Sequence, residues 1–350
     1  MSSALSASEE KTFQENESTL SETQIRAGLG VLGKHPITLK HTYLELKVVN
    51  AGVKDISALS KYPCLMYVNL SNNKLEDAKI LNDIPALMQL DLSHNSLTRC
   101  LDFNPVCCNK EHAWSQGDTA IGSMLTKANL SHNNIFKLDS LAHHPFLEVL
   151  IISNNSIECI EGLSTLKFLK VLDVSNNRIT DITGLDYLEL NELNLRQNRI
   201  TLLSGLEKCL KLSSLDVSSN SIRSLLPLKD CANLMWLDAR DNQIEYARQA
   251  EFLSELTWLN TVLLMGNPCS RKHMYRRRVI HRLRNLFKLD ESAVTAEEKI
   301  ETANMFGTEL SDADGRMNVF YKHLPHDSFE NPIIFQDEEL SLTEAQLQGV

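Results

Sequence analysis

The stretch VLDVSNNRI, residues Val171–Ile179, alternates apolar and polar side chains and then places a polar Asn177 inside an otherwise apolar pattern. The alternation at Leu172-Asp173-Val174 has the period of two that indicates a short β-strand. Nearly the same phrase returns along the chain in the form Leu-x-x-Leu-x-Leu-x-x-Asn-x-Leu. The stretch is therefore one copy of an internal repeat, and the repeat decides the fold.

The copies follow one another at steps of 22, 22, 38, 22, 22, 21, 22, 22 and 25 residues. Ala51 takes the key position in the first copy, and an Asn takes it in the others: Asn73, Asn95, Asn133, Asn155, Asn177, Asn198, Asn220, Asn242 and Asn267. This near-constant period is typical of a leucine-rich repeat solenoid. It predicts an α/β arc of about ten coils, with a parallel sheet on the concave face and 3-10 or helical turns on the convex side.

Each repeated Asn follows a strand, where the backbone turns and its N–H and C=O groups lose their partners in the sheet. An Asn amide has two donor hydrogens and an acceptor oxygen. A buried Asn can therefore satisfy such groups in its own coil and in the neighbouring one. We expect a ladder of nine buried Asn side chains that joins the coils.

The segments that return to the next strand carry an apolar residue at every third position, for example Ile157, Ile160, Leu163, Leu166, Leu169 and Leu172. A spacing of three fits 3-10 turns better than an α-helix. Cys100, Cys209 and Cys231 fall in such series, so we expect them to be small buried core residues. The return segment after Asn242 is one step longer, which predicts a true helix there.

Both ends of a solenoid need polar caps. Residues 22–35 predict a first helix with Ser21 as its N-cap and with Ile25, Leu29 and Leu32 on one face. After Asn267-Pro268, apolar residues recur at helical spacing and predict an amphipathic helix that closes the core: Tyr275, Val279, Leu283 and Leu286. The chain is thus divided into a disordered acidic tail (1–24), a repeat domain with both caps (25–290) and an acidic C-terminal tail (291–350).

The 22-residue unit resembles the subclass of leucine-rich repeats that is named after a nuclear regulatory subunit of protein phosphatase 1. The resemblance covers about residues 42–290. It extends to proteins that join such repeats to a guanylate kinase domain, through Asn267-Pro268, Tyr275, Leu289-Asp290 and Glu297-Glu298-Lys299. No Gly-x-x-x-x-Gly-Lys-Ser/Thr loop is present, so no kinase chemistry is expected. The subclass includes several axonemal proteins, which implies a ciliary or flagellar location.

Composition adds little beyond this. The first twenty residues are acidic and rich in Ser, without the features of a secretory signal. No apolar run is long enough for a membrane span. We therefore expect a cytoplasmic protein, in the cytoskeleton of a cilium or flagellum, without a cofactor, a small-molecule substrate or a membrane partner.

The outward positions of the strands are the first candidate binding site. Between the two apolar positions of Leu-x-Leu stand four Asp residues, which in line would form a stripe on the concave face. Paired carboxylates can do acid–base work, but a solvated stripe is the stronger interpretation, and we expect no catalysis. The predicted docking face consists of Tyr67, Asp91, Ile151, Asp173, Arg196, Asp216, Trp236, Asp238 and Arg240, with Met265 beside it.

The second candidate is a basic cluster in the C-terminal cap. Residues 271–289 contain eight basic residues and no acid: Arg271, Lys272, Arg276, Arg277, Arg278, Arg282, Arg284 and Lys288. Such a cluster attracts acidic partners. Tubulin, nucleic acid and the chain's own acidic tail are candidates, as is a solvated face partly neutralised by residues 290–315. The net charge of −10 and the lack of a stacking platform argue against nucleic acid.

An insertion of about sixteen residues, at about 104–121, explains the one long step between copies. It contains Cys107, Cys108 and His112, which leave a zinc site imaginable. Adjacent cysteines are not a usual ligand spacing, so a recognition loop is preferred and no metal is expected.

These features predict a non-enzymatic interaction scaffold that binds other proteins, axonemal proteins or tubulin among them. The alternative is a regulatory subunit that binds protein phosphatase 1 through the concave face. An enzyme remains a third and weaker hypothesis.

Overall fold

The computed structural model describes residues 19–34, 39–103, 123–138, 141–186 and 188–306. The chain divides into two compact units. The first holds the residues up to 179 together with 183–194, and the second holds 180–182 and the residues from 195 onward. The predicted insertion, with Cys107, Cys108 and His112, lies outside the described residues.

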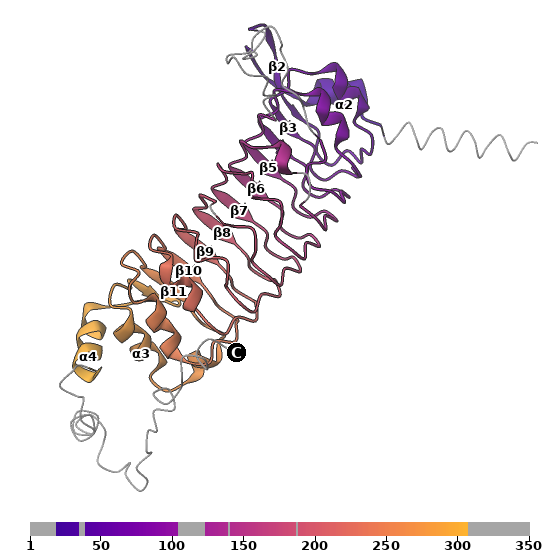
Figure 1. The fold of residues 1–350 in the computed structure, drawn as a ribbon. Helices are drawn as coiled ribbons and strands as arrows, with labels where there is room; N and C mark the ends of the chain where they lie inside the picture. The colour runs from indigo at the N-terminus through magenta and orange to yellow at the C-terminus, as the bar shows by residue number, and fades with distance from the viewer. Residues whose placement is uncertain (1–18, 35–38, 104–122, 139–140, 187, 307–350) are drawn as a thin grey trace, which may run out of the picture. The chain divides into compact units, whose positions relative to one another are not determined.

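The first unit begins with an antiparallel pair of strands and continues as a row of parallel strands. Helix α2 (Glu22–Gly28) leads into β1 (Leu29–Lys34), which pairs antiparallel with β2 (His41–Lys47). One short strand per coil then follows in sequence order, each parallel to the last: β3 (Tyr67–Asn69), β4 (Gln89–Asp91), β5 (Lys127–Asn129), β6 (Val149–Ile151), β7 (Val171–Asp173) and β8 (Glu192–Asn194). Figure 1 shows this order. The return segments include the 3-10 helices η1 (Ser57–Lys61), η2 (Lys79–Asp83) and η3 (Leu141–His143).

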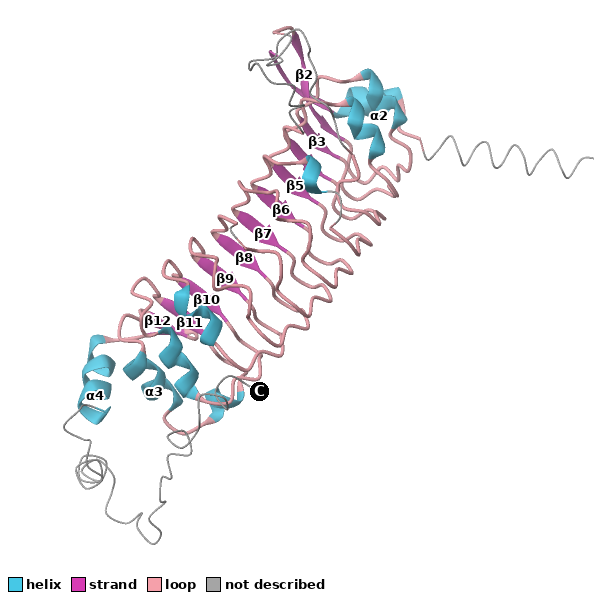
Figure 2. Cartoon of the chain, viewed as in Figure 1, coloured by secondary structure: helices cyan, strands magenta, loops and turns pink. Residues whose placement is uncertain are grey.

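The second unit repeats the plan and ends in helices, as Figure 2 shows. Its parallel strands are β9 (Ser214–Asp216), β10 (Trp236–Asp238), β11 (Thr261–Leu263) and β12 (Lys288–Leu289), and β13 (Ser292–Ala293) pairs antiparallel with β12. The 3-10 helices are η4 (Leu226–Asp230), η5 (Ala247–Leu253) and η6 (Pro268–Arg271), and the α-helices are α3 (Tyr275–Arg282) and α4 (Ala296–Phe306). The predicted leucine-rich repeat solenoid is thus confirmed in each unit.

The core of each coil is built from the residues that recur at every third position. In one coil, Leu163, Leu166 and Leu169 are all fully buried. The Leu166 N–H donates to the Leu163 carbonyl at 2.9 Å, and the Leu169 N–H donates to the Leu166 carbonyl at 3.1 Å. These bonds span three residues, as in 3-10 turns, so the predicted geometry is confirmed. Buried leucines of this kind contribute about 2 kcal/mol each through the hydrophobic effect.

The N-terminal cap differs from the predicted helix over 22–35. Ser21 does form the N-cap, in a capping box with Gln24, so order begins before residue 25. The helix ends at Gly28, however, and the chain continues as the strand β1. Leu32 is 66% exposed on that strand rather than packed on a helical face. Gly28 allows this path, because a Cβ there would lie 2.4 Å from the Lys47 carbonyl oxygen.

The return segment after Asn242 forms the 3-10 helix η5, so the predicted true helix is wrong in type. Its buried residues Ala247, Ala250 and Leu253 keep the spacing of three. A 3-10 helix holds such residues on one side, whereas an α-helix would rotate them away from the core.

The C-terminal cap contains the predicted amphipathic helix α3, which buries Tyr275, Val279 and Ile280. Its helical geometry ends at Arg282, although Leu283 and Leu286 beyond it are also buried. Part of the predicted acidic tail is also structured, because α4 packs against α3.

Candidate functional site

The turn after each strand has the same backbone conformation in every coil. The residue before the ladder position has φ between 53° and 57° in Asn72, His94, His132, Asn154, Asn176, Gln197, Ser219 and Asp241, and Gly266 takes the place in the last coil with φ 79°. This left-handed region is open mainly to Gly, Asn, Asp and His. The recurrence of such residues just before the ladder Asn therefore has a backbone cause. His94 and His132 stack with their ring centroids 4.0 Å apart, and burial lowers the pKa of His132, with a further contribution from the nearby His94.

The side-chain amides of the ladder Asn join neighbouring coils. Five of them are buried, as predicted, whereas Asn95, Asn155, Asn198 and Asn220 are half-buried, because their side chains lie nearer the surface. The Asn177 oxygen accepts the Ile157 N–H at 3.0 Å, and its nitrogen donates to the carbonyls of Ile152 and Val174, both at 3.0 Å. Ile152 and Ile157 belong to the preceding coil and Val174 to its own. The oxygens of other ladder residues accept equivalent backbone N–H groups: Asn73, Asn95, Asn133, Asn155, Asn220, Asn242 and Asn267. The Asn198 nitrogen donates to the Leu195 carbonyl.

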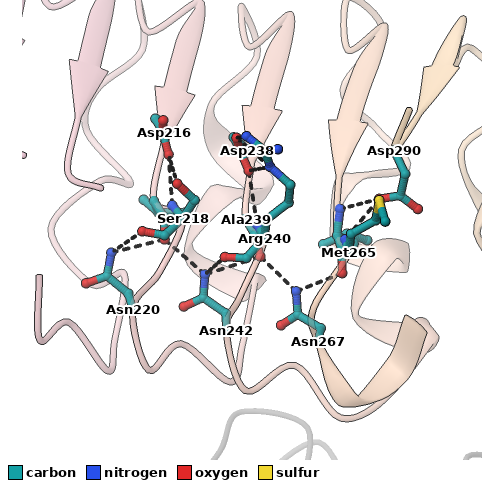
Figure 3. A network of polar contacts seen from close by, with 12 residues as sticks. Asp216, Ser218, Asn220, Asp238, Ala239, Arg240, Asn242, Met265, Asn267 and Asp290 are labelled. Carbon is teal, nitrogen blue, oxygen red and sulfur yellow. Dashed lines mark hydrogen bonds and ion pairs between the residues drawn. The ribbon is translucent and has the colours of Figure 1, made fainter. Parts of the chain in front are cut away.

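The ladder of the second unit ends at Asp290, in place of a further Asn. Its Oδ1 accepts the N–H groups of Leu264 and Met265 at 2.7 and 3.0 Å, and its Oδ2 accepts the Tyr275 hydroxyl at 2.9 Å. Figure 3 shows Asn220, Asn242 and Asn267 in a row, with Asp290 beyond them. An acceptor alone suffices here, because Asp290 receives only donors. Burial and the Asp290 charge raise the pKa of the Tyr275 hydroxyl.

The Asp residues of the predicted docking face have a structural role. The Oδ1 atoms of Asp91, Asp173 and Asp216 accept the backbone N–H of the Ser two residues later at 3.0, 2.9 and 2.9 Å. Such side-chain turns cap the end of each strand. Burial raises the pKa of Asp216, while its bonds to Ser218 oppose the shift. These carboxylates are half-buried, and each uses one oxygen to accept the hydrogen bond that holds the turn after its strand. This structural role accounts for the Asp stripe without a catalytic role.

Asp238 is not available on the docking face, contrary to the prediction. It is 1% exposed and lies under the Arg240 side chain. Arg240 Nε donates to both carboxylate oxygens at 3.0 Å and the backbone N–H of Arg240 donates to Oδ1. These hydrogen bonds raise the pKa of Arg240. Arg240 lies two positions further along the chain, and its side chain covers the Asp238 carboxylate. The alternation of the strand alone would leave that carboxylate exposed.

Apolar side chains form the rest of the outward strand face in the second unit. Trp236 alternates with the buried Leu237, so it points away from the core, and Thr261 is its in-register neighbour on β11. Leu263 on the same strand is half-buried, and Met265 just beyond it is 43% exposed. Leu263 was missed in the sequence, although its place between Val262 and Leu264 marks it as outward. Arg196 is exposed, as predicted.

The first unit has its own apolar patch on the outward face of its strands. Ile151 and Val149 of β6 are half-buried, and Val149 pairs in register with the half-buried Val171 of β7. Val149 and Val171 were missed, because a valine in a strand is read first as a core residue. Tyr67 is half-buried on β3.

The predicted basic cluster is divided by the fold. Arg276 donates to Glu298 Oε1 and Oε2 on α4 at 2.8 and 2.9 Å, and to the carbonyls of Leu289 and Ala293. Arg277 lies 3.6 Å from Glu301. The acidic residues of α4 thus neutralise one side of α3. The remaining members are exposed or half-buried: Arg271, Lys272, Arg278, Arg282, Arg284 and Lys288.

His144, in the first unit, is a packing residue of the core. It is fully buried, its ring lies 4.8 Å from the Phe103 ring, and its Nε2 lies 3.3 Å from the Leu101 carbonyl oxygen. Burial lowers the pKa of His144 to about 4. Cys100, Cys209 and Cys231 are fully buried, and burial raises the pKa of the Cys231 thiol to about 12. These thiols are core residues, as expected.

No group of three or more His, Cys, Asp or Glu side chains in the part of the chain that the structure describes is placed to hold a metal ion. Among the helices of the described ranges, none has the length and apolar character needed to cross a membrane.

Comparison with known proteins bears on the fold. Residues 145–187 match the family model described as leucine-rich repeats in two copies. A search of curated proteins gives no significant match. A leucine-rich repeat protein from Leptospira interrogans superposes with a TM-score of 0.55 and 23% identity, over 67% of this chain and 57% of that one.

Two further structures are similar. The functional domain of InlJ from Listeria monocytogenes, described as including a cysteine ladder, has a TM-score of 0.52 and 19% identity, over 74% of this chain and 56% of that one. The plant peptide hormone receptor RGFR1, in complex with RGF2, has a TM-score of 0.51 and 19% identity, over 71% of this chain and 39% of that one. This chain spans little more than half of two of these proteins and less than half of the third. At such identities the likeness shows the fold alone.

Proposed function

We propose that this leucine-rich repeat protein is a non-enzymatic scaffold that binds other proteins through the outward faces of its strands. The observation that carries the proposal is the group of partly exposed apolar residues Trp236, Leu263 and Met265 on the face of a hydrogen-bonded sheet. Trp is among the residue types enriched in binding hot spots. Trp236 and Leu263 stand on strands and Met265 follows β11 at a distance of two residues, so their binding geometry is formed before a partner arrives. The plant receptor solved in complex with RGF2 supports binding by this fold.

The finer part of the proposal places the scaffold in the axoneme of a cilium or flagellum, with axonemal proteins or tubulin as partners. The resemblance of the 22-residue unit to axonemal repeat proteins supports it. Immunofluorescence of ciliated cells tests it, and a protein confined to the cell body would exclude the location while leaving the scaffold intact.

The scaffold itself is tested on a partner identified by cross-linking mass spectrometry from native cells. A variant with Trp236→Ser and Met265→Ser should bind that partner at least about tenfold more weakly, since a hot-spot residue contributes 2 kcal/mol or more. Leu210→Ser is the matched control, because Leu210 is 58% exposed on a return segment. Equal affinities of the two variants would rule out the strand face of the second unit as the binding surface.

The second candidate function is regulation of protein phosphatase 1. The subclass resemblance favours it, and the strand face would again be the binding surface. Purified catalytic subunit should then bind the full chain, and the Trp236→Ser and Met265→Ser variant should lose that binding. Absence of binding at micromolar concentrations would remove this alternative.

A further inference from the structure

A row of exposed apolar side chains lies in the second unit, at the edge where strands β10 to β12 begin. Met235 directly precedes β10, and Phe287 directly precedes β12. Asn260, before β11, joins them: its N–H donates to the Met235 carbonyl at 3.0 Å, and its carbonyl accepts the Phe287 N–H at 2.8 Å. Trp258 lies two residues before Asn260, beyond the buried Leu259. Met235, Trp258 and Phe287 therefore belong to three successive coils, and we call them the edge patch.

The edge patch is unusually open for apolar residues. Met235, Trp258 and Phe287 are 43%, 63% and 72% exposed. Isolated apolar side chains on a surface are ordinary, whereas a group of them bordered by polar residues is typical of an interaction surface. The patch therefore calls for an occupant with apolar side chains.

The border of the patch at Phe287 is positively charged. Lys288 is the next residue along the chain and is exposed. The Nζ of Lys299 on α4 lies 5.4 Å from the centroid of the Phe287 ring. Two acids of the same helix, Glu298 and Glu301, are paired with arginines of α3. An occupant that places carboxylates beside its apolar side chains is therefore complementary to this border.

The chain itself contains a segment of this composition. Residues 307–350, outside the described part of the chain, contain two apolar islands. The first, Met317–Leu324, includes Lys322 and follows Arg316, so its charges match those of the border and are repelled. The second, Pro332–Phe335, lies between Glu330 on one side and three successive acids at 337–339 on the other. Its charges are opposite to those of Lys288 and Lys299.

The second island can reach the edge patch. Helix α4 ends at Phe306, seven residues beyond Lys299, which is about 10 Å along a helix. Residues 307–331 connect the helix to the island, and a chain of this length spans up to about 80 Å when extended. A tethered segment that can span the distance has an effective concentration in the millimolar range, so a weak contact is enough to fill the patch.

We propose that residues 330–339 of this chain bind to the edge patch and cover it. The apolar island packs on Trp258 and Phe287. The flanking carboxylates lie beside Lys288 and Lys299. The segment thereby withholds the patch from other partners until it is displaced. The inference does not depend on the strand-face proposal, since no residue of that proposal takes part.

The chain's own segment is favoured over a membrane surface. A Trp and a Phe beside lysines also fit the interface of an anionic bilayer. Residues 307–350, however, follow α4 directly and carry a net charge of −7 (nine acids minus two bases). That charge would be repelled by anionic lipid and is attracted by the lysines of the border.

The test measures binding of a fluorescein-labelled peptide of residues 330–340, ENPIIFQDEEL, to the full chain by fluorescence anisotropy. In one variant of the full chain, Ile333, Ile334 and Phe335 are each replaced by Ser. The peptide should bind this variant at least about tenfold more tightly than the unchanged chain, because the variant's own segment no longer competes for the patch.

Substitutions added to this triple variant then locate the binding site. Phe287→Ser should weaken peptide binding by about tenfold or more, as expected of a central apolar contact. Leu210→Ser is the matched control, because Leu210 is 58% exposed on a return segment of the same unit, and its change should stay within about threefold. Lys288→Glu should also weaken binding, whereas Lys229→Glu, an equally exposed change on η4, should have little effect.

Four results would overturn the proposal. Equal binding to the unchanged chain and to the triple variant, or binding to neither, would show that the segment does not occupy the patch. Equal losses in Phe287→Ser and Leu210→Ser would mean non-specific apolar adsorption. Binding of phosphatidylserine vesicles that depends on Phe287, without peptide binding, would assign the patch to a membrane. A dimer of the unchanged chain in light scattering, with a monomeric triple variant, would place the segment on a second copy.

Discussion

Replacement of Asn177 by Ala tests the ladder that joins the coils of the first unit. The change removes the acceptor of the Ile157 N–H and the donor to the Val174 and Ile152 carbonyls. The Ile152 carbonyl keeps a bond from Asn155 at 3.2 Å. The Ile157 N–H has no other hydrogen-bond acceptor among the described residues.

The expected cost follows from these losses. Asn177 is 8% exposed, so water reaches the freed groups poorly. A buried group left without its partner costs about 1–3 kcal/mol, so the lost bond of the Ile157 N–H gives a loss of about 2 kcal/mol in the free energy of unfolding. The loss is concentrated between two coils, because each repeat contacts only its neighbours.

The assay combines urea unfolding with hydrogen exchange followed by mass spectrometry. Unfolding gives the global loss, and exchange of the peptide that contains Ile157 gives the local one, which does not rely on two-state behaviour. Asn134→Ala is the control, since the Asn134 side chain is exposed and the change should stay within about 0.5 kcal/mol. If Asn177→Ala resembles Asn134→Ala in both measurements, the ladder does not stabilise the solenoid and the reasoning is refuted.

Two further predictions concern a buried histidine and the cap. The pKa of His144 is lowered to about 4 from 6.5, so the folded state holds the ring neutral while the unfolded chain protonates it. Stability should therefore fall by about 3 kcal/mol as the pH drops from about 6.5 to about 4. In the His144→Leu variant, the free energy of unfolding measured in urea should fall less over this pH range, by about the contribution of His144. If it falls as much as in the unchanged protein, the prediction is contradicted. Arg276→Ala should raise amide exchange in α4 about tenfold, because it removes the bidentate pair with Glu298. Arg277→Ala should have little effect on this exchange, because Arg277 makes a single, longer contact with Glu301. Similar exchange in the two variants would show that Arg276 does not hold α4 in place.

Much of the fold could be predicted because the repeat places the same constraint in every coil. The Leu-x-Leu strands, the core residues at every third position and the positions of the ladder Asn all follow from local spacing. The cap helix α3 followed from helical periodicity in the same way. The N-terminal cap could not be predicted so well, because glycines at 28, 30 and 33 permit a helix or a strand and the choice depends on pairing with β2.

The candidate site was harder to predict than the fold. Alternation placed Trp236 and Asp238 on the outward face, but alternation does not say which neighbour covers a side chain. Asp238 is buried because Arg240 folds over it. The basic cluster was visible as eight charges, yet the pairing of Arg276 and Arg277 with acidic residues depends on where α4 packs.

The amino-acid sequence by itself determined the solenoid. A strand that cannot bury its own face must stack on its copies, and these copies recur along the chain at a nearly constant period. The accessibility and pairing of the charged groups were decided only by the tertiary structure. These properties depend on contacts between residues far apart in the chain, such as Arg276 with Glu298 and Arg277 with Glu301. Local spacing carries no information about such pairs, since each of them forms only when two separate segments have packed together.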